Sequence, residues 1–275
     1  MILSYHPCFT ADENRLCAGR LPDPSDLAII RAASAVILPQ GCPRPLYQMA
    51  RDNCPRIFPN YDVRFKYPDK TGQIRLFRQA GIPHPFSAAF ENTAAYDSCV
   101  RPDILPDGLV FPLVFKYAWG GEGKTVFLLK NSRELEKQLG NAAVFEKSGQ
   151  TGFLLQTYIP AAGRVLRVVR IGKRSISYWR IAADPDRFPI NLSAGCTIDH
   201  DMDPDRQLDA LAITDQLCRR TGINLAGFDF IFPADEQPPR PLLLEINYFF
   251  GRKGLGGSEA YYDLLTDQIR KWLDG

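Results

Sequence analysis

Two carboxylates and one amide, one within an apolar segment and two at the end of the next, are the residues best suited to bind a metal. Asp229 lies within an apolar segment, and Glu245 and Asn247 end the next one. Residues two apart on a strand point to the same face, so two neighbouring strands would bring these three side chains together. Close carboxylates repel each other unless a cation lies between them. Because Mg²⁺ takes one or two carboxylates plus substrate phosphates, we predict a magnesium site here rather than a polar sheet rim.

A lysine and a glycine-rich loop supply groups that bind phosphate. Lys116 ends an apolar segment, residues 110–116, and the loop that follows contains Gly120, Gly121 and Gly123. A lysine acts as a point charge on phosphate, and glycines let backbone N–H groups approach phosphate oxygens closely. An ordinary loop after a common lysine is an equal alternative when these residues are considered alone.

The same loop has a partial likeness to a P-loop, because it ends in Gly123-Lys124-Thr125. The P-loop motif requires glycine where this sequence has Ala118, and it requires a helix directly after the loop. Residues 125–129 are apolar and favour a strand instead. A strand, a glycine loop and a second strand are typical of a flap over phosphates, so we reject the P-loop.

Arg167 and Arg180 are the candidate catalytic cations. They lie on the two strands of a hairpin predicted over residues 165–171 and 175–181, with its turn at Gly172-Lys173. Arginine on a strand is often simply solvated. Two arginines that face a metal and phosphate site could instead stabilise the charge of a transferring phosphoryl group.

The elements that must position these residues alternate between helix and strand, which predicts an α/β (α+β) protein. Helices are expected over residues 26–33, 70–80, 131–139, 205–221 and 261–273. Strands are expected over residues 35–39, 110–116, 125–129, 153–159, 165–171, 175–181, 228–232 and 241–247. Gly81 and Gly222 end two of the helices.

Composition excludes several classes of protein. The chain has 275 residues, of which 45% are hydrophobic, and its net charge is only +2. A nucleic-acid partner is not expected, because no basic excess or basic run is present. No run of about 18 apolar residues exists, so no membrane span is expected. The seven scattered cysteines and the lack of a signal peptide favour reduced thiols and a cytoplasmic location.

Three further motifs are weaker. Residues 199–205 resemble the start of a calcium loop, but Pro204 occupies the glycine position and Ala210 the position of the bidentate glutamate. The three histidines are too scattered for a triad or a zinc site. Arg252 and Lys253, in the loop of residues 251–257, could close over an acidic substrate or belong to a simple connection.

The order of these motifs resembles the ATP-grasp superfamily, in particular its glutathione synthetase and ribosomal-protein glutamate ligase type. The resemblance covers residues 67–275 approximately. It rests on Asp69-Lys70, residues 112–116, the glycine flap, residues 156–159, Arg167, Arg180, residues 191–195, Asp229 and residues 245–247. It implies an ATP-grasp domain over residues 67–275 after a small N-terminal α/β unit, residues 1–66. A flap subdomain would span about 110–158, and a metal-binding subdomain about 163–275.

The resemblance also implies a role for each residue. Contacts with the ATP phosphates would come from Lys70, Lys116, Gly120, Gly121 and Gly123. The adenine would meet the backbone of a hinge at Gln156, Tyr158 and Ile159. One or two Mg²⁺ ions, with Mn²⁺ as a substitute, would bind Asp229, Glu245 and Asn247. Arg167, Arg180 and Asn191 would face the γ-phosphate and the acceptor carboxylate.

The activity implied is a carboxylate–amine ligase that converts ATP to ADP and phosphate through an acylphosphate. Its partners would be small-molecule or peptide carboxylates and amines, with no nucleic acid and no membrane. A homo-oligomer is compatible with the sequence. Two alternatives stay open: an ATP-grasp protein that transfers phosphate without ligation, and a non-catalytic nucleotide-binding protein.

Overall fold

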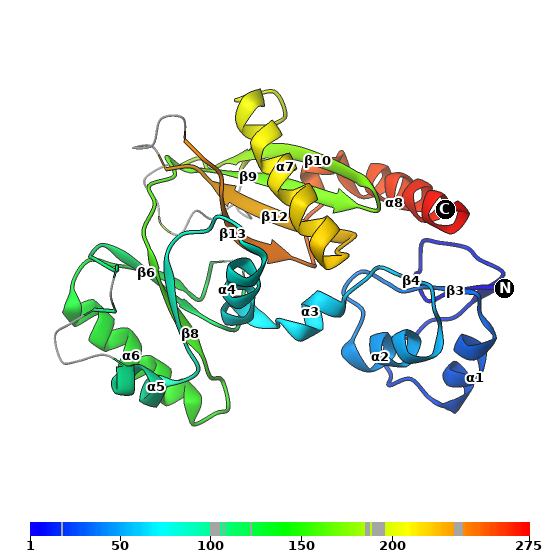
Figure 1. Ribbon diagram of the computed structural model, residues 1–275, viewed down its shortest axis with the longest axis horizontal. Coiled ribbons are helices and arrows are strands. Elements are labelled where there is room, and N and C mark those ends of the chain that lie inside the picture. The colour runs from blue at the N-terminus through cyan, green and yellow to red at the C-terminus, as the bar shows by residue number, and fades with distance from the viewer. Residues whose placement is uncertain are drawn as a thin grey trace.

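Three β-sheets and the helices that cover them make up the computed structural model (Figure 1). The structure describes residues 1–17, 19–99, 105–106, 108–121, 123–184, 188, 196–233 and 239–275. Figure 1 shows the N-terminal unit at one end, a sheet with α5 and α6 at the other, and the largest sheet with α7 between them. This mixed α/β architecture confirms the predicted fold class.

The N-terminal unit contains a parallel sheet. Its strands, in spatial order, are β2 (Glu13–Asn14), β1 (Ile2–Ser4), β3 (Ala35–Ile37) and β4 (Ile57–Phe58). Its helices are α1 (Pro24–Ala32), α2 (Arg44–Asn53) and α3 (Asp62–Lys66). The carboxylate of Asp23 accepts hydrogen bonds from the first turn of α1, and the Asp23 N–H donates to the carboxylate of Asp26, so a capping box starts this helix.

The flap sheet is antiparallel, and two helices cover one of its faces. In spatial order its strands are β5 (Ser87–Phe90), β8 (Phe153–Thr157), β6 (Leu113–Tyr117) and β7 (Val126–Leu129). Helices α5 (Thr93–Cys99) and α6 (Ser132–Glu146) cover the face that carries Phe115 and Phe153, whose rings stack 4.9 Å apart. Because side chains alternate along a strand, Lys116 lies on the opposite face.

The largest sheet carries Asp229 and Glu245, the two carboxylates of the predicted metal site. Its strands, in spatial order, are β11 (Thr197–Asp199), β10 (Arg174–Ile181), β9 (Arg164–Ile171), β12 (Leu225–Ile231) and β13 (Leu242–Asn247). Helices α4 (Asp69–Ala80) and α7 (Pro204–Thr221) pack against the face of Val168, and α8 (Gly257–Asp274) packs against the face of Val169. Arg167 shares the face of Val169, so its side chain lies on the side of the sheet that α8 partly covers.

The N-terminal unit is fixed to the large sheet through the segment that follows β13. The Gln40 amide donates to the carbonyl of Tyr248 at 3.3 Å and accepts from the Tyr261 hydroxyl of α8 at 3.0 Å. Arg56 donates to the last carbonyls of α8, those of Trp272 and Leu273. These bonds link the segment after β13 and the end of α8 to the N-terminal unit.

Several element boundaries differ from those predicted. Helix α6 continues through Gly140 to Glu146, where residue 139 was expected to end it, because Ala142 is buried in the flap core. Strand β8 ends at Thr157, two residues earlier than expected.

Within the described part of the chain, no helix is long and apolar enough to cross a membrane.

Candidate active site

The three predicted metal ligands lie together on β12 and β13. In this antiparallel pair Asp229 lies opposite Glu245, and Gly227 lies opposite Asn247. The amide nitrogen of Asn247 donates to Asp229 Oδ2 and to Glu245 Oε1, both at 3.0 Å. The pairing that the prediction required is therefore present, and one amide N–H₂ group bridges the two carboxylates.

Asp229 is the electrostatic centre of this cluster, although its side chain is only 5% exposed. Arg167 binds it with two bonds, from Nε to Oδ1 at 2.8 Å and from Nη2 to Oδ2 at 2.7 Å. Arg180 adds a contact to Oδ1 at 2.8 Å. Burial alone would raise the pKa of Asp229, but the two guanidinium groups outweigh it and lower the pKa to about 2.

The donor set suits a magnesium ion that shares its coordination with substrate. Among the described residues, no group of three or more His, Cys, Asp or Glu side chains is arranged so that it could hold a metal ion by itself. Both oxygens of Asp229 already accept from arginine, and the Asn247 N–H₂ supplies the positive end between the two carboxylates. Two carboxylates and an amide fit Mg²⁺ because it prefers a few protein oxygens together with phosphates over an all-protein cage.

Two lysines face the acidic cluster from other elements. Burial lowers the pKa of Lys116 to about 8, Glu245 acts in the opposite direction, and Lys70 lowers it further. Burial also lowers the pKa of Lys70, again opposed by Glu245. A strand of the flap sheet and helix α4 therefore place two ammonium groups close enough to the Glu245 carboxylate for its charge to raise their pKa values. Phosphate is a suitable ligand for cations placed in this way.

The glycine flap lies next to Lys70. Its ammonium group donates to the carbonyls of Trp119 at 3.1 Å and Gly120 at 2.9 Å. Gly120 has a φ of +77°, and a Cβ there would lie 2.6 Å from the Thr125 methyl carbon, so only glycine fits. Strand β7 starts at Val126, directly after the loop. The predicted strand is confirmed, and a P-loop is excluded because no helix begins there.

The predicted hinge lies where β8 ends. Gln156 is buried, and its amide donates to the Ser87 hydroxyl at 2.9 Å, so this side chain ties β8 to β5. Tyr158 and Ile159 follow the strand, with Tyr158 against Phe188 and Ile159 against a small apolar cluster. Gln156 is therefore a link between two strands of the flap sheet, and the side chains of Tyr158 and Ile159 are half-buried.

The remaining candidates occupy varied surroundings. Asn191 lies outside the described residues. Arg252 stacks on Tyr262, with its guanidinium carbon 4.4 Å from the ring centroid, and Lys253 donates to the carbonyl of Cys196 at 2.8 Å. Asp203, in the segment that resembles a calcium loop, forms an ion pair with Arg164 at 3.0 Å.

One residue of the site had not been predicted. Gln73 lies on α4, three residues after Lys70, and its amide makes two hydrogen bonds to the backbone of Ile246. Positions three apart on a helix share a face, so the spacing from Lys70 was the available signal. Gln73 thereby holds the helix that carries Lys70 against the strand that carries Glu245.

Fold and site together define a member of the ATP-grasp superfamily, as the sequence had indicated. Residues 68–264 match the RimK-like ATP-grasp domain, and the chain belongs to this family. No protein of curated function matches the sequence.

Solved structures with this fold include several ATP-grasp proteins. The RimK domain protein ATP-grasp from Sphaerobacter thermophilus has a TM-score of 0.65 at 15% identity, covering 97% of this chain and 98% of that one. D-alanine–D-alanine ligase from Bacillus anthracis, complexed with ATP, has a TM-score of 0.65 at 16% identity, covering 96% and 87%. L-amino acid ligase from Bacillus licheniformis has a TM-score of 0.55 at 13% identity, covering 89% and 58%. At these identities the likeness concerns the fold.

Proposed function

We propose that this protein is an ATP- and magnesium-dependent ligase that joins a carboxylate to an amine. The observation that carries the proposal is the arrangement of Lys70 and Lys116 opposite Glu245, between the flap sheet and the large sheet. Membership of the RimK-like ATP-grasp family supports it. The ligases among the structural relatives support the reaction class, since two of them are named for joining amino acids.

The side chains divide the work between binding and charge stabilisation. Lys70, Lys116 and the N–H groups of the flap bind and orient the phosphates, and the hinge backbone at residues 156–159 binds adenine. Asp229, Glu245 and Asn247 hold Mg²⁺, which when bound neutralises phosphate charge. Arg167 and Arg180, oriented by Asp229, face the transferring phosphoryl group. Positioning and charge neutralisation are what phosphoryl transfer requires from a protein.

The reaction then has two balanced steps. An oxygen of the acceptor carboxylate attacks the γ-phosphorus of ATP, and ADP leaves, which gives an acylphosphate. The amine attacks the acyl carbon, phosphate leaves, and the amine nitrogen loses a proton as the amide bond forms. No serine or cysteine nucleophile is needed, because the carboxylate is activated by the phosphoryl group. The substrates are small-molecule or peptide carboxylates and amines in the cytoplasm.

A screen of amino acids and short peptides for ADP release, with mass detection of products, tests this function. The proposal expects ADP release that needs both a carboxylate and an amine. It also expects a product whose mass equals the sum of the two reactants minus one water. ADP release without an amine, and with no amide product when amines are supplied, would instead indicate phosphotransfer without ligation. Tight ATP binding with no turnover for any pair would indicate a non-catalytic nucleotide-binding protein.

A further inference from the structure

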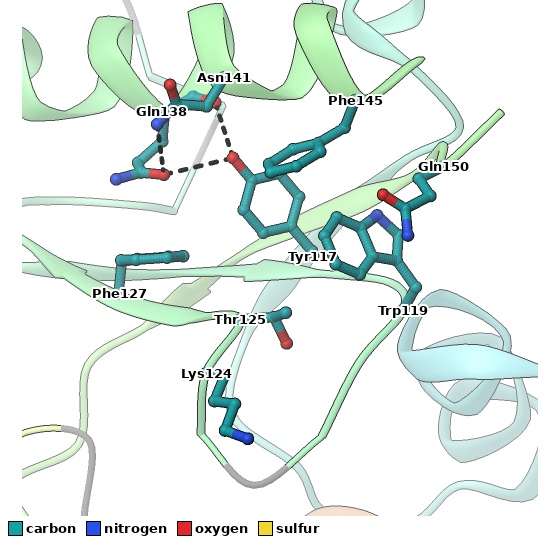
Figure 2. Close-up of a pocket in the computed structure, with 9 residues that line it drawn as sticks. All are labelled: Tyr117, Trp119, Lys124, Thr125, Phe127, Gln138, Asn141, Phe145 and Gln150. Atoms are coloured by element: carbon teal, nitrogen blue, oxygen red, sulfur yellow. Dashed lines mark hydrogen bonds between the residues drawn. The ribbon is translucent and has the colours of Figure 1, made fainter. Parts of the chain in front are cut away.

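Different contacts hold the two loops that border the candidate active site. The glycine flap is backed by aromatic rings of the flap core, where Tyr117 and Trp119 stack with centroids 5.1 Å apart and Phe145 meets Trp119 edge-on at 4.9 Å (Figure 2). The second loop, residues 251–257, follows β13 and contacts the large sheet through Tyr178 of β10. The proposed function gives this tyrosine no role.

A row of four polar residues crosses the large sheet in register. Tyr178 of β10 lies opposite Arg167 of β9. Arg167 lies opposite Asp229 of β12, which in turn lies opposite Glu245 of β13. Residues directly opposite each other on neighbouring strands share a face of the sheet, and their side chains are close enough to interact. The row therefore connects Tyr178 with a predicted metal ligand through the arginine and aspartate of the site.

The hydroxyl of Tyr178 lies among the arginines of the site, and the residue is only 1% exposed. Burial raises the pKa of Tyr178, while the charges of Arg167 and Arg180 and a hydrogen bond from Arg167 act in the opposite direction. Arg167 uses Nε and Nη2 for Asp229, and a guanidinium group has further N–H donors to give. Tyr178 therefore holds Arg167 on one side, from β10, and Asp229 holds it on the other, from β12.

The ring of Tyr178 packs against the backbone of Gly254. A Cβ at Gly254 would lie 2.3 Å from two ring carbons of Tyr178, so the contact requires glycine. Closer to β13 the same segment passes beside Arg167, because a Cβ at Gly227 of β12 would meet Phe250 at 3.3 Å and Arg167 Nε at 3.5 Å. The segment therefore leaves the strand at one end of the row and contacts the tyrosine at the other end.

We propose that Tyr178 is a positioning residue that fixes the loop of residues 251–257 across the large sheet and holds Arg167 in place. Its ring acts on the loop through Gly254, and its hydroxyl acts on Arg167. Arg252 and Lys253 directly precede Gly254, so the ring contact also determines where these two cations lie. The effect on catalysis through Arg167 rests on the proposed function, whereas the effect on the loop does not.

Hydrogen exchange of the loop, followed by mass spectrometry, tests the ring contact. The N–H groups of Leu255 and Gly257 both donate to the carbonyl of Arg252, so their exchange reports how firmly the loop is held. Gly254→Ala should speed this exchange about tenfold or more relative to the exchange of α7 in the same protein. Gly251→Ala is the control, because a Cβ there meets no atom of the described residues within 4 Å. Equal loop exchange in the two variants would overturn the proposal.

Tyr178→Phe separates the two contacts, because it keeps the ring and removes only the hydroxyl. Its loop should exchange as in the wild type, while kcat for ADP release falls about fivefold or more and the KM for ATP stays within about twofold. Tyr96→Phe, in the flap core, is the control and should change neither. An unchanged kcat in Tyr178→Phe would overturn the role of the hydroxyl. If the wild type releases no ADP with any carboxylate and amine, the proposed ligase fails, and the exchange of Gly254→Ala alone decides whether Tyr178 fixes the loop.

Discussion

The side-chain amide of Gln73 on α4 makes two hydrogen bonds to the backbone of Ile246 on β13, as the backbone of a neighbouring strand would. Its amide nitrogen donates to the Ile246 carbonyl at 2.9 Å, and its amide oxygen accepts from the Ile246 N–H at 2.8 Å. Lys70 lies one helical turn before Gln73, and Glu245 and Asn247 flank Ile246. The two hydrogen bonds therefore fix the position of a candidate phosphate-binding cation relative to two candidate metal ligands.

Replacing Gln73 with leucine should destabilise the protein. The Ile246 N–H and carbonyl would lose their partners in a partly buried setting, at a cost of about 1–3 kcal/mol in the free energy of unfolding. Urea denaturation measures this change. Arg75→Ala, an exposed substitution on the same helix, is the control and should stay within about 0.5 kcal/mol of the wild type. Equal stabilities for the two variants would show that the hydrogen bonds between Gln73 and Ile246 do not stabilise the protein.

Much of the fold follows from local pattern, but these pairings do not. Runs of apolar residues predicted the strands that carry Lys116, Asp229 and Glu245, and strand periodicity placed Glu245 and Asn247 on one face. Which strands are neighbours, and in which register, depends on packing between distant parts of the chain. The contact of Gln73 with Ile246 spans 173 residues, and no periodicity in the sequence marks it.

The arginines illustrate the same limit. The hairpin that carries Arg167 and Arg180 was predicted, with its turn, from strand signals and Gly172-Lys173. Their shared ion pair with Asp229 was not, because it arises only when β9 packs between β10 and β12. Local signals also misplaced some ends: a helix was expected to end at residue 139, yet α6 continues to Glu146 because Ala142 is buried.

The ion pairs of Asp229 should make stability depend on acid pH. Its pKa in the folded protein, about 2, lies below the value of about 3.9 for an unfolded aspartate. The stabilisation is therefore complete above about pH 4 to 5 and is lost as the pH falls towards 2, by about 2 kcal/mol in all. Urea denaturation of wild type and Asp229→Asn between pH 6 and pH 2.5 measures it.

At pH 6 the Asp229→Asn variant should be less stable by about 3–5 kcal/mol, because two guanidinium groups remain without their carboxylate. At pH 2.5 the difference in the free energy of unfolding between wild type and Asp229→Asn should be about 2 kcal/mol smaller than at pH 6. Asp209→Asn, on the exposed side of α7, provides the control and should show no such narrowing. If the difference in the free energy of unfolding between wild type and Asp229→Asn stayed constant with pH, the ion pairs of Asp229 would not be what stabilises the folded protein.

Replacing Lys116 with methionine should raise the stability of the protein and weaken its binding of ATP. Burial lowers the pKa of this lysine to about 8, which means that its charged form destabilises the folded protein at neutral pH. Wild-type stability should therefore rise as the pH increases from about 8 to about 10.4. Lys116→Met should gain on the order of 1 kcal/mol at pH 7, a small effect because the ammonium group stays partly solvated.

The same variant should bind ATP with Mg²⁺ about tenfold more weakly or worse, a loss of about 1.4 kcal/mol or more. Calorimetric titration and urea denaturation, performed on the same samples, give both quantities. The exposed Lys130 of the flap region supplies the control, since Lys130→Met should change neither. Lower stability with unchanged ATP affinity would make Lys116 a structural residue only.

The flap should tolerate alanine at one glycine and not at the next. Gly120→Ala places a Cβ 2.6 Å from the Thr125 methyl carbon at a φ of +77°, whereas a Cβ at Gly121 meets no atom of the described residues within 4 Å. Gly120→Ala should therefore lower the free energy of unfolding by about 1 kcal/mol or more, and Gly121→Ala by less than about 0.5 kcal/mol. Thermal denaturation of both variants compares them, and equal losses would contradict the loop geometry.

The central claim is that the acidic end of β13 binds ATP together with Mg²⁺. The direct test is calorimetric titration of ATP, with and without Mg²⁺, into wild type, Glu245→Gln and the exposed control Glu136→Gln. We predict that wild type and the control bind ATP about tenfold or more tightly when Mg²⁺ is present, and that Glu245→Gln loses most of this dependence. Unchanged ATP affinity and unchanged magnesium dependence in Glu245→Gln would contradict the metal site and the function proposed from it.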